Sequence, residues 1–202
     1  MPLSPVALSG KTVTLVPLSP DHHDGLVSAV RDGALWRLWY TAVPKPEDVA
    51  AHIERCLKRQ TAGTMLPFTV IDHISGDVVG MTTYLNIDLD TPRLEIGATW
   101  YAKRVQRTAL NTEAKLLLLS HAFDQLGCLA VELRTHVMNH QSRRAIERLG
   151  ARLDGILRQH MRMADGTLRD TCVYSILDRE WPTVRTHLAH KLQQHDEAAL
   201  PA

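Results

Sequence analysis

The hydrophobic positions of the chain follow two repeats, one typical of strands and one typical of helices. Stretches rich in β-branched residues and bounded by Gly, Pro, Asp or Ser predict strands. These strands are expected over residues 11–18, 65–72, 77–86, 93–101, 128–137, about 154–163 and 169–177. Glycine-containing turns at 75–77 and 165–166 indicate that the strands flanking each turn form hairpins.

Helices are predicted where apolar residues recur every three or four positions. They are expected over residues 21–30, 46–60, 112–126, 139–149 and 182–194. Leu119, Ala122 and Phe123 show this spacing, and Gly127 follows them as a C-cap. Asn139 stands at the start of the fourth helix, where an N-cap is expected.

The order of these elements predicts a layered architecture. A strand, a helix and a strand between residues 93 and 137 imply a parallel pair with a right-handed crossover, whereas the flanking hairpins are antiparallel. We therefore expect an α/β (α+β) fold, with a mixed, mostly antiparallel central sheet and helices on both faces. A single domain is expected over residues 1–202, with its core at about 11–181 and a C-terminal helix at about 182–194.

Composition and charge exclude several classes of partner. The 23 basic and 22 acidic residues leave a formal net charge of +1, which gives no electrostatic footprint for nucleic acid or for a membrane surface. Cys56, Cys128 and Cys172 lie far apart, so neither a zinc site nor a disulfide framework is predicted. The scattered cysteines therefore predict no bound metal. Because the start of the chain does not resemble a signal peptide, we expect a cytoplasmic protein with reduced thiols.

Three segments carry a resemblance to a known family. They are EIGATWY at 95–101, QRTALNTEAKLLLLSHAF at 106–123 and NHQSRRAIERLGA at 139–151. In this order, and with this order of strands, the chain resembles the GNAT N-acetyltransferases, in the branch that includes the RimJ/RimL-type ribosomal-protein enzymes. The similarity covers about residues 11–181 and implies a GNAT fold whose one parallel strand pair is splayed. A homodimer is expected from the resemblance only.

The resemblance implies a site for acetyl-CoA as co-substrate. Its pyrophosphate would bind the N–H groups at the start of the helix after residue 106, with the helix dipole assisting. Arg104 and Arg107 would add mobile positive charge nearby. Trp100 and Tyr101 would flank the pantetheine, although Trp100 could simply belong to the core. The implied cofactor-binding residues are Trp100, Tyr101, Arg104, Gln106, Arg107, Thr108, Ala109, Leu110, Asn111, Thr112, Asn139 and Ser142.

This cofactor turn departs from the family's usual motif, Q/R-x-x-G-x-G/A. Ala109 and Asn111 occupy its two small positions. Glycine in such a turn lets the backbone approach a phosphate closely, and alanine adds only one methyl group. Asn111 tolerates unusual dihedral angles and could also cap the helix. We interpret the turn as altered rather than lost, with its backbone N–H groups at 109–112 as the anchor.

Two residues are candidates for the chemistry of transfer. Glu95 lies within an apolar strand, where burial raises the pKa of a carboxyl group, and by resemblance it is a candidate base. The alternative is a carboxylate paired with Arg93 or a helix cation. Ser142, on the apolar face of its helix, would by resemblance protonate the leaving thiolate. The alternative is a serine that, like Asn139, only helps to cap the helix.

The acceptor side is less specific. Trp36, Trp39 and Tyr40 fall within five residues, in a stretch that walls the acceptor site in the family. The alternative is a helix core, with Trp36 and Tyr40 four positions apart. Tyr84 could also face the acceptor. The implied activity is direct acetyl transfer to a primary amine, of a protein N-terminus or of a small molecule. A non-catalytic acyl-CoA-binding protein is the alternative.

Overall fold

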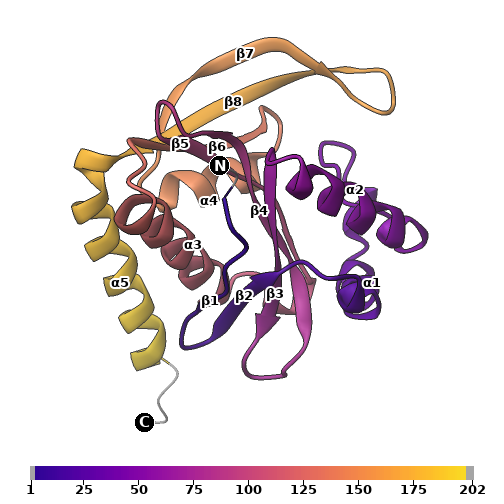
Figure 1. Ribbon diagram of the computed structural model, residues 1–202, viewed down its shortest axis with the longest axis horizontal. Helices are drawn as coiled ribbons and strands as arrows, with labels where there is room; N and C mark the ends of the chain where they lie inside the picture. Colours follow the sequence, from indigo (N-terminus) through magenta and orange to yellow (C-terminus); the bar gives the residue numbers. More distant parts are fainter. Residues whose placement is uncertain (1–2, 199–202) are drawn as a thin grey trace.

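The computed structural model describes residues 3–198 of the 202-residue chain. Its centre is an eight-stranded sheet in the order β1-β2-β3-β4-β5-β6-β8-β7, shown in Figure 1. The strands are β1 (Leu8–Ser9), β2 (Val13–Pro17), β3 (Met65–Asp72), β4 (Val78–Asp88), β5 (Arg93–Tyr101), β6 (Ala130–His136), β7 (Arg152–Arg162) and β8 (Leu168–Leu177). All neighbouring strands are antiparallel except β5 and β6, which are parallel.

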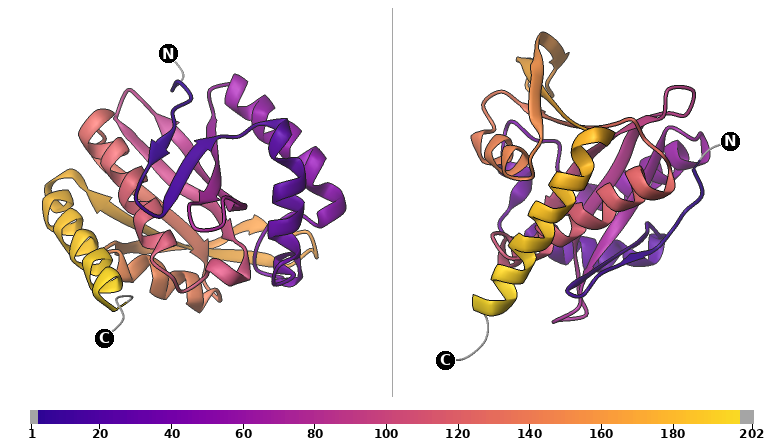
Figure 2. Two further views of the ribbon diagram at one scale, coloured as in Figure 1. Left: turned by 90° about the horizontal axis from the view of Figure 1, so that it is seen from below. Right: turned by 90° about the vertical axis from the view of Figure 1, so that its left-hand side faces the viewer.

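The helices cover both faces of this sheet. They are α1 (His23–Arg31), α2 (Val49–Thr61), α3 (Leu110–Ser120), α4 (His140–Arg148) and α5 (Trp181–Ala198). Helices α1 and α2 pack on β4 and β3 from one side, while α3 lies on the other side with α5 across its outer surface (Figures 1 and 2). The expected mixed α/β architecture with helices on both faces is confirmed.

Most predicted elements are confirmed with small differences at their ends. Strand β1 is a strand that the hydrophobic pattern does not predict. The turn that joins it to β2 is held by Glu113 of α3, whose carboxylate accepts the N–H groups of Lys11 and Thr12 at 2.6 and 2.7 Å. The helix predicted over 112–126 begins earlier, at Leu110, and its last part, His121–Gln125, is a π-helix. Of the described residues, none forms a helix long and apolar enough to cross a membrane.

The hairpin of β7 and β8 extends away from the helices. In Figure 1 it arches over the top of the molecule, with β7 as the outer strand of the sheet. Along β7 nearly every side chain is exposed. Irregular pairing between Leu157 and Met161 bends the hairpin, and Gln159 adopts a positive φ of 48° at this point.

Candidate active site between strands β5 and β6

The parallel strands β5 and β6 separate soon after they meet. Only three register pairs join them, and the last is Glu95 with Glu132. Beyond this point β5 continues to Tyr101 and β6 to His136, with β4 and β8 paired on their outer sides. The inner edges of both strands therefore carry backbone groups without a strand partner, so an extended ligand can bond to them as an added strand does. The splayed pair expected from the sequence is confirmed.

The turn after β5 presents backbone N–H groups at the start of α3. The N–H groups of five residues donate to no atom of the described chain: Arg107, Thr108, Ala109, Asn111 and Thr112. Arg107 has a positive φ of 64°, which turns the chain into the helix. Such a set of free donors beside a helix N-terminus suits a phosphate group. The turn thus keeps the required donors although both glycines are replaced.

Side chains of this turn hold its shape. Thr108 Oγ donates to the carbonyl of Val105 at 2.8 Å and accepts the N–H of Leu110 at 3.3 Å. Thr108 thus contacts the first N–H group of α3, and the suggestion that Asn111 caps the helix is wrong, since Ala109 is the N-cap and Asn111 lies inside α3. The Gln106 side-chain amide donates to the carbonyl of Tyr101 at 2.8 Å and ties the turn to the end of β5.

Arg104 does not supply the mobile charge expected of it. Its guanidinium lies 3.4 Å from a carboxylate oxygen of Asp32 and 3.0 Å from one of Asp77. The backbone N–H of Arg104 also donates to the Asp32 carboxylate. These contacts tie the side chain toward α1 and the β3–β4 turn. Arg107 is exposed and makes no ion pair within the described residues, so of the two arginines it is the one left to meet a phosphate.

Trp100 and Tyr101 are buried at the end of β5, at 7% and 8% exposure. The Tyr101 hydroxyl lies in the interior without a hydrogen-bond partner among residues 3–198. Burial raises the pKa of this phenol, so it stays protonated and able to donate. Tyr101 is the last residue of β5, the strand that borders the opening, and a buried donor without a partner calls for an explanation.

Asn139 and Ser142 begin α4, four residues after β6 ends. The Asn139 side chain accepts the N–H of Ser142 at 3.0 Å, so the expected N-cap is confirmed. The Ser142 side chain is half-buried and its hydroxyl bonds to no other described residue. The cap therefore uses the backbone of Ser142 and leaves its hydroxyl available.

Glu95 lies on the opposite side of this opening, with 7% of its surface exposed. Its Oε2 accepts the Asn86 amide at 2.7 Å and lies 3.5 Å from Nε of Arg134. Burial raises the pKa of Glu95, while Arg134 and then Asn86 oppose this rise. Arg93 bonds to Glu132 instead, so the pairing with Arg93 considered as an alternative role for Glu95 is not formed.

Two residues that the sequence analysis missed hold this carboxylate. A methyl group on Gly97 would lie 2.6 Å from Oε1 of Glu95, so only glycine leaves the carboxylate its position. Asn86 has a positive φ of 47° at an irregularity of β4, and this backbone turns its amide toward Glu95. A glycine inside a strand was the available signal, because it marks a close approach.

Lys115 of α3 is buried below β5 without a carboxylate partner among the described residues. Its Nζ bonds to Thr99 at 2.9 Å and Thr82 at 3.3 Å. Burial lowers the pKa of this amine to about 7. Both threonine oxygens also bond to one another at 2.8 Å, so the amine sits in a small, closed polar group.

The aromatic residues after α1 differ in their surroundings. Leu35–Arg37 forms one short 3-10 turn, so the alternative of a helix core over Trp36 and Tyr40 is wrong. Trp36 packs on the hydrophobic core. Trp39 is 55% exposed, and its ring centroid lies 5.1 Å from that of His136 and 5.5 Å from that of Tyr40. This contact brings the loop to the end of β6, beside the opening.

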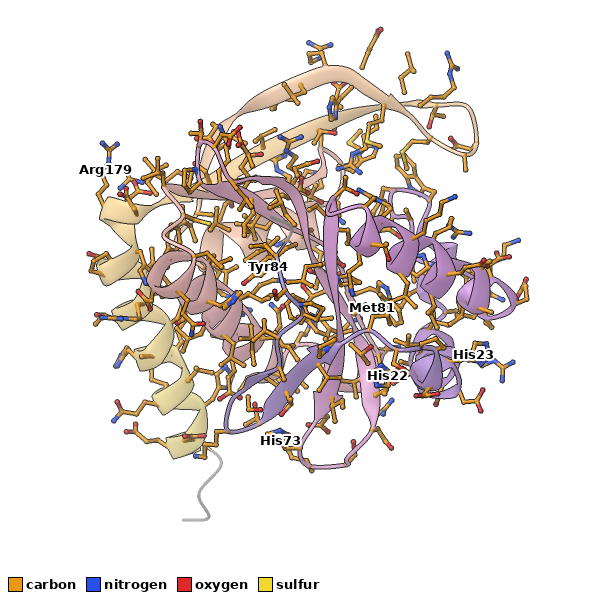
Figure 3. All side chains as sticks on the ribbon, viewed as in Figure 1. His22, His23, His73, Met81, Tyr84 and Arg179 are labelled. Atoms are coloured by element: carbon orange, nitrogen blue, oxygen red, sulfur yellow. The ribbon has the colours of Figure 1, made fainter. Side chains whose placement is uncertain are left out.

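Tyr84 does not belong to the acceptor side. It is fully buried in the middle of the molecule (labelled in Figure 3). Its hydroxyl donates to the carbonyl of Leu118 at 2.6 Å, and its ring stacks on that of His121. Its neighbour Leu85 is opposite Glu95, so Tyr84 points to the other face of the sheet. The prediction that Tyr84 faces the acceptor is therefore wrong.

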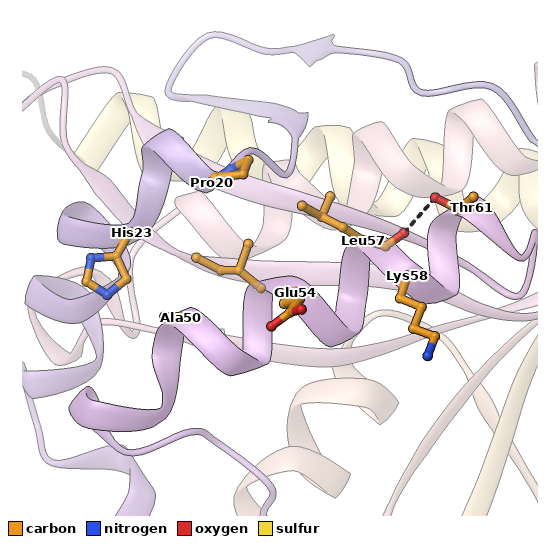
Figure 4. A pocket seen from close by; sticks show the side chains of 8 residues that line it. Pro20, His23, Ala50, Glu54, Leu57, Lys58 and Thr61 are labelled. Carbon is orange, nitrogen blue, oxygen red and sulfur yellow. Dashed lines mark hydrogen bonds between the residues drawn. The ribbon is translucent and has the colours of Figure 1, made fainter.

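A hollow of about 650 Å³ lies elsewhere, between α1 and α2. It is lined by Pro20 and His23 and by residues of α2 that include Ile53, Leu57 and Lys58 (Figure 4). None of these residues touches the opening between β5 and β6. The candidate chemistry is thus placed in the splayed strands, where donors and titratable groups converge, rather than in this apolar hollow.

Comparison with known proteins agrees with this geometry. Residues 12–152 match the family model described as "Acetyltransferase (GNAT) domain". A GCN5-related N-acetyltransferase from Brucella melitensis has a similar structure, with a TM-score of 0.85 and 31% identity over 95% of this chain and 87% of that one. RimJ of Mycobacterium smegmatis, solved with CoA-disulfide, shares the fold at a TM-score of 0.75 and 21% identity over 93% of each chain.

A curated relative is similar over a shorter stretch. The ribosomal N-acetyltransferase-type protein YdaF of Bacillus subtilis (strain 168) is 33% identical over 106 residues. The matching part covers 52% of this chain and 57% of that protein's length. The expected resemblance to GNAT acetyltransferases is confirmed by the family model, and YdaF is a relative from the ribosomal-protein branch.

Proposed function

Because this chain belongs to the acetyltransferase (GNAT) domain family, we propose that it is an enzyme that moves an acetyl group from acetyl-CoA directly to a primary amine. The observation that carries the proposal is the separation of β5 and β6 next to five free N–H groups at the start of α3. The proposal treats residues 1–202 as one cytoplasmic domain, in which the three cysteines are buried free thiols.

The residues of this site fit coenzyme A, which would carry the acetyl group. The inner edges of β5 and β6 would bond to the pantetheine amides, and the N–H groups of 107–112 would hold the pyrophosphate with help from Arg107. When bound, this co-substrate supplies an acetyl thioester, which the amine nitrogen attacks as the carbon–sulfur bond breaks.

The chain's own groups would handle the protons of this step. Glu95, whose raised pKa makes it a better base than an ordinary carboxylate, accepts a proton from the ammonium before attack or from the amine nitrogen as it attacks, directly or through water. Ser142 has a hydroxyl without a partner among the described residues; it donates a proton to the departing sulfur and regains one from water. Most of the rate gain would come from holding the two substrates in one orientation.

The acceptor would enter from the face of the sheet that carries Glu95. Trp39 and Tyr40 would wall this side, because Trp39 stands against His136 at the end of β6 while more than half of its own surface is exposed. Trp36 would support the loop from the core. Both acceptor classes, a protein N-terminus and a small-molecule amine, can be tested with one thiol-release assay.

The test combines binding with turnover. Acetyl-CoA binding is measured by isothermal titration calorimetry, and release of free thiol is followed over a panel of amines. We expect binding, amine-dependent thiol release, and a Glu95→Gln variant with at least tenfold lower kcat. The matched control is Glu47→Gln, an exposed carboxylate outside the site. No binding of acetyl-CoA would overturn the proposal.

A second candidate function is a non-catalytic acyl-CoA-binding protein. The replacement of both small residues of the cofactor turn by Ala109 and Asn111 favours it. The same experiment separates the two functions. Tight binding of acetyl-CoA with no thiol release for any amine would support the binding protein and exclude the enzyme.

A further inference from the structure

The face of the sheet that carries Glu95, here called the acceptor face, holds a row of polar side chains on β5, β6 and β8. Glu95 lies opposite Glu132, and His136 lies opposite Thr171 on β8. Residues directly opposite on neighbouring strands share a face, and so do residues two apart on one strand. Arg169, two positions before Thr171, therefore belongs to the same face as the candidate base.

Arg169 differs from the other guanidinium groups of this face in its pairing. Arg93 and Arg134 both bond to the Glu132 carboxylate, and Arg134 also approaches Glu95. Arg169 makes one hydrogen bond, from Nε to the Thr171 hydroxyl at 2.9 Å. No carboxylate oxygen of residues 3–198 lies within 4.0 Å of it. It is a partly buried cation without an anion.

The remaining donors of Arg169 have a defined geometry. Because Nε is held by Thr171, both terminal nitrogens are left on one edge of the planar group. That edge binds carboxylate or phosphate through two parallel hydrogen bonds. Burial lowers the pKa of this guanidinium, but an arginine side chain stays charged at neutral pH.

His136 adds a neutral donor to the same place. Its Nδ1 accepts the N–H of Met138 at 3.0 Å, so the hydrogen-bond network assigns the proton to Nε2. Burial and then the charge of Arg169 lower the pKa of His136, which keeps the ring neutral. Trp39 packs against this ring at the edge of the acceptor side.

Arg169 also lies close enough to the candidate base for their charges to interact. Its positive charge lowers the pKa of Glu95, and the carboxylate in turn favours the charged guanidinium. An anion held by Arg169 would thus stand near the group that takes the proton from the amine. If one acceptor molecule carries both an amine and an acidic group, the contact of the acidic group with Arg169 would orient the amine toward Glu95.

We propose that Arg169 binds an acidic group of the acceptor, so that the acceptor is a small amine carrying a carboxylate or a phosphate rather than the N-terminus of a protein. The inference rests on the proposed acetyl transfer, whose acceptor class it narrows. It assigns to Arg169 a role in substrate specificity, since the group would touch the acceptor and take no part in bond making.

Matched amines test this specificity. Thiol release is measured with phenylalanine against phenylalaninamide, with phosphoethanolamine against ethanolamine, and with a peptide that has a free N-terminus. Binding of each amine to the coenzyme A complex is measured by calorimetry. We expect kcat/KM and affinity to be at least tenfold higher for the acidic member of one pair. A preference in the phenylalanine pair would identify the bound group as a carboxylate, and one in the ethanolamine pair as a phosphate.

Variants assign the preference to this residue. Arg169→Gln is expected to abolish it by raising KM for the acidic amine at least tenfold relative to its neutral partner, so that the variant uses the two members of the pair within twofold of one another. Arg158→Gln is the control, because this arginine of the same hairpin already pairs with Asp170 at 2.9 Å. It should retain the preference.

The outcomes separate the two proposals. Thiol release with equal use of acidic and neutral amines, or a preference for the peptide, overturns the role of Arg169 and leaves acetyl transfer standing. A preference that survives in Arg169→Gln overturns it as well. If no amine leads to thiol release, acetyl transfer itself is contradicted. In that case, equal calorimetric affinities for the two members of each pair would independently reject the binding of an acidic group by Arg169.

Discussion

Gly97 and Glu95 are two positions apart on β5, and the first provides the space that the carboxylate of the second occupies. A Cβ atom at Gly97 would lie 2.6 Å from Oε1 of Glu95 and 2.9 Å from Cδ1 of Leu85. The backbone of Gly97 does not need a left-handed conformation, so its lack of a side chain serves the packing of Glu95 and Leu85.

The first prediction concerns this contact. Gly97→Ala should move the Glu95 carboxylate away from Asn86 and lower kcat about 10-fold to 100-fold, since a general base contributes on the order of 10²–10⁴-fold. Acetyl-CoA affinity should stay within twofold, as measured by calorimetry. Gly155→Ala is the matched control, because nothing lies within 4 Å of a Cβ there. Equal kcat in both variants would reject the positioning role.

The second prediction concerns pH dependence. The Asn86 amide bonds to the charged form of Glu95 and lowers its pKa, so Asn86→Gly should raise that pKa. As Glu95 acts when it is deprotonated, the rising acid limb of kcat/KM should move to higher pH. Glycine suits the positive φ of 47° at this position, which avoids strain. Asn86→Asp should move the limb further, and an unchanged profile in both variants would contradict Glu95 as the base.

The third prediction follows from the buried amine of Lys115. Its pKa is about 7 in the fold against 10.5 ordinarily, so the unfolded chain holds one more proton between these values. The free energy of unfolding should therefore rise with pH over this window, by about 2–3 kcal/mol from pH 7 to 9. Lys115→Met should lose this slope and be more stable than the wild type at pH 6.5.

Urea unfolding of both proteins at several pH values measures this difference. Lys45→Met serves as the control, because this lysine is exposed and its replacement should keep the slope of the wild type. Parallel curves for wild type and Lys115→Met would show that the amine titrates in the fold as it does in the unfolded chain.

The fourth prediction separates a core tyrosine from an acceptor contact. Tyr84→Phe leaves the Leu118 carbonyl without its 2.6 Å hydrogen bond and should cost about 1–2 kcal/mol of stability, with the acceptor KM within twofold. Trp39→Ala should do the reverse: it should raise the acceptor KM and change stability by less than about 0.5 kcal/mol. A raised KM in Tyr84→Phe would return this residue to the acceptor side.

The sequence predicts the fold well where local signals are strong. The segments 65–72 and 93–101 coincide with β3 and β5, because polar residues and turns bound their apolar runs. Strand β1 has only two residues, and its place depends on Glu113, about a hundred residues away. The start of α3 differs because the Thr108 hydroxyl, rather than Asn111, contacts its first N–H group.

The site is predictable only in part, for a geometric reason. Period-two alternation shows that Tyr84 and Leu85 point to opposite faces, but it does not tell which face meets the acceptor. Asn86 comes near Glu95 because of an irregularity in the pairing of β4 with β5, and Arg169 because of the register between β6 and β8. A single sequence does not reveal either feature. Glu95 and Ser142 lie within segments that resemble a family, and they remain candidates for its chemistry.

The three-pair junction of β5 and β6 has a consequence for how the protein behaves in solution. It leaves two strand edges open inside the molecule, and open edges are templates for pairing with other chains. A pantetheine arm lying between them would cover both edges at once. Coenzyme A should then act as a protectant against aggregation, and light scattering on heating should begin at a higher temperature when it is present.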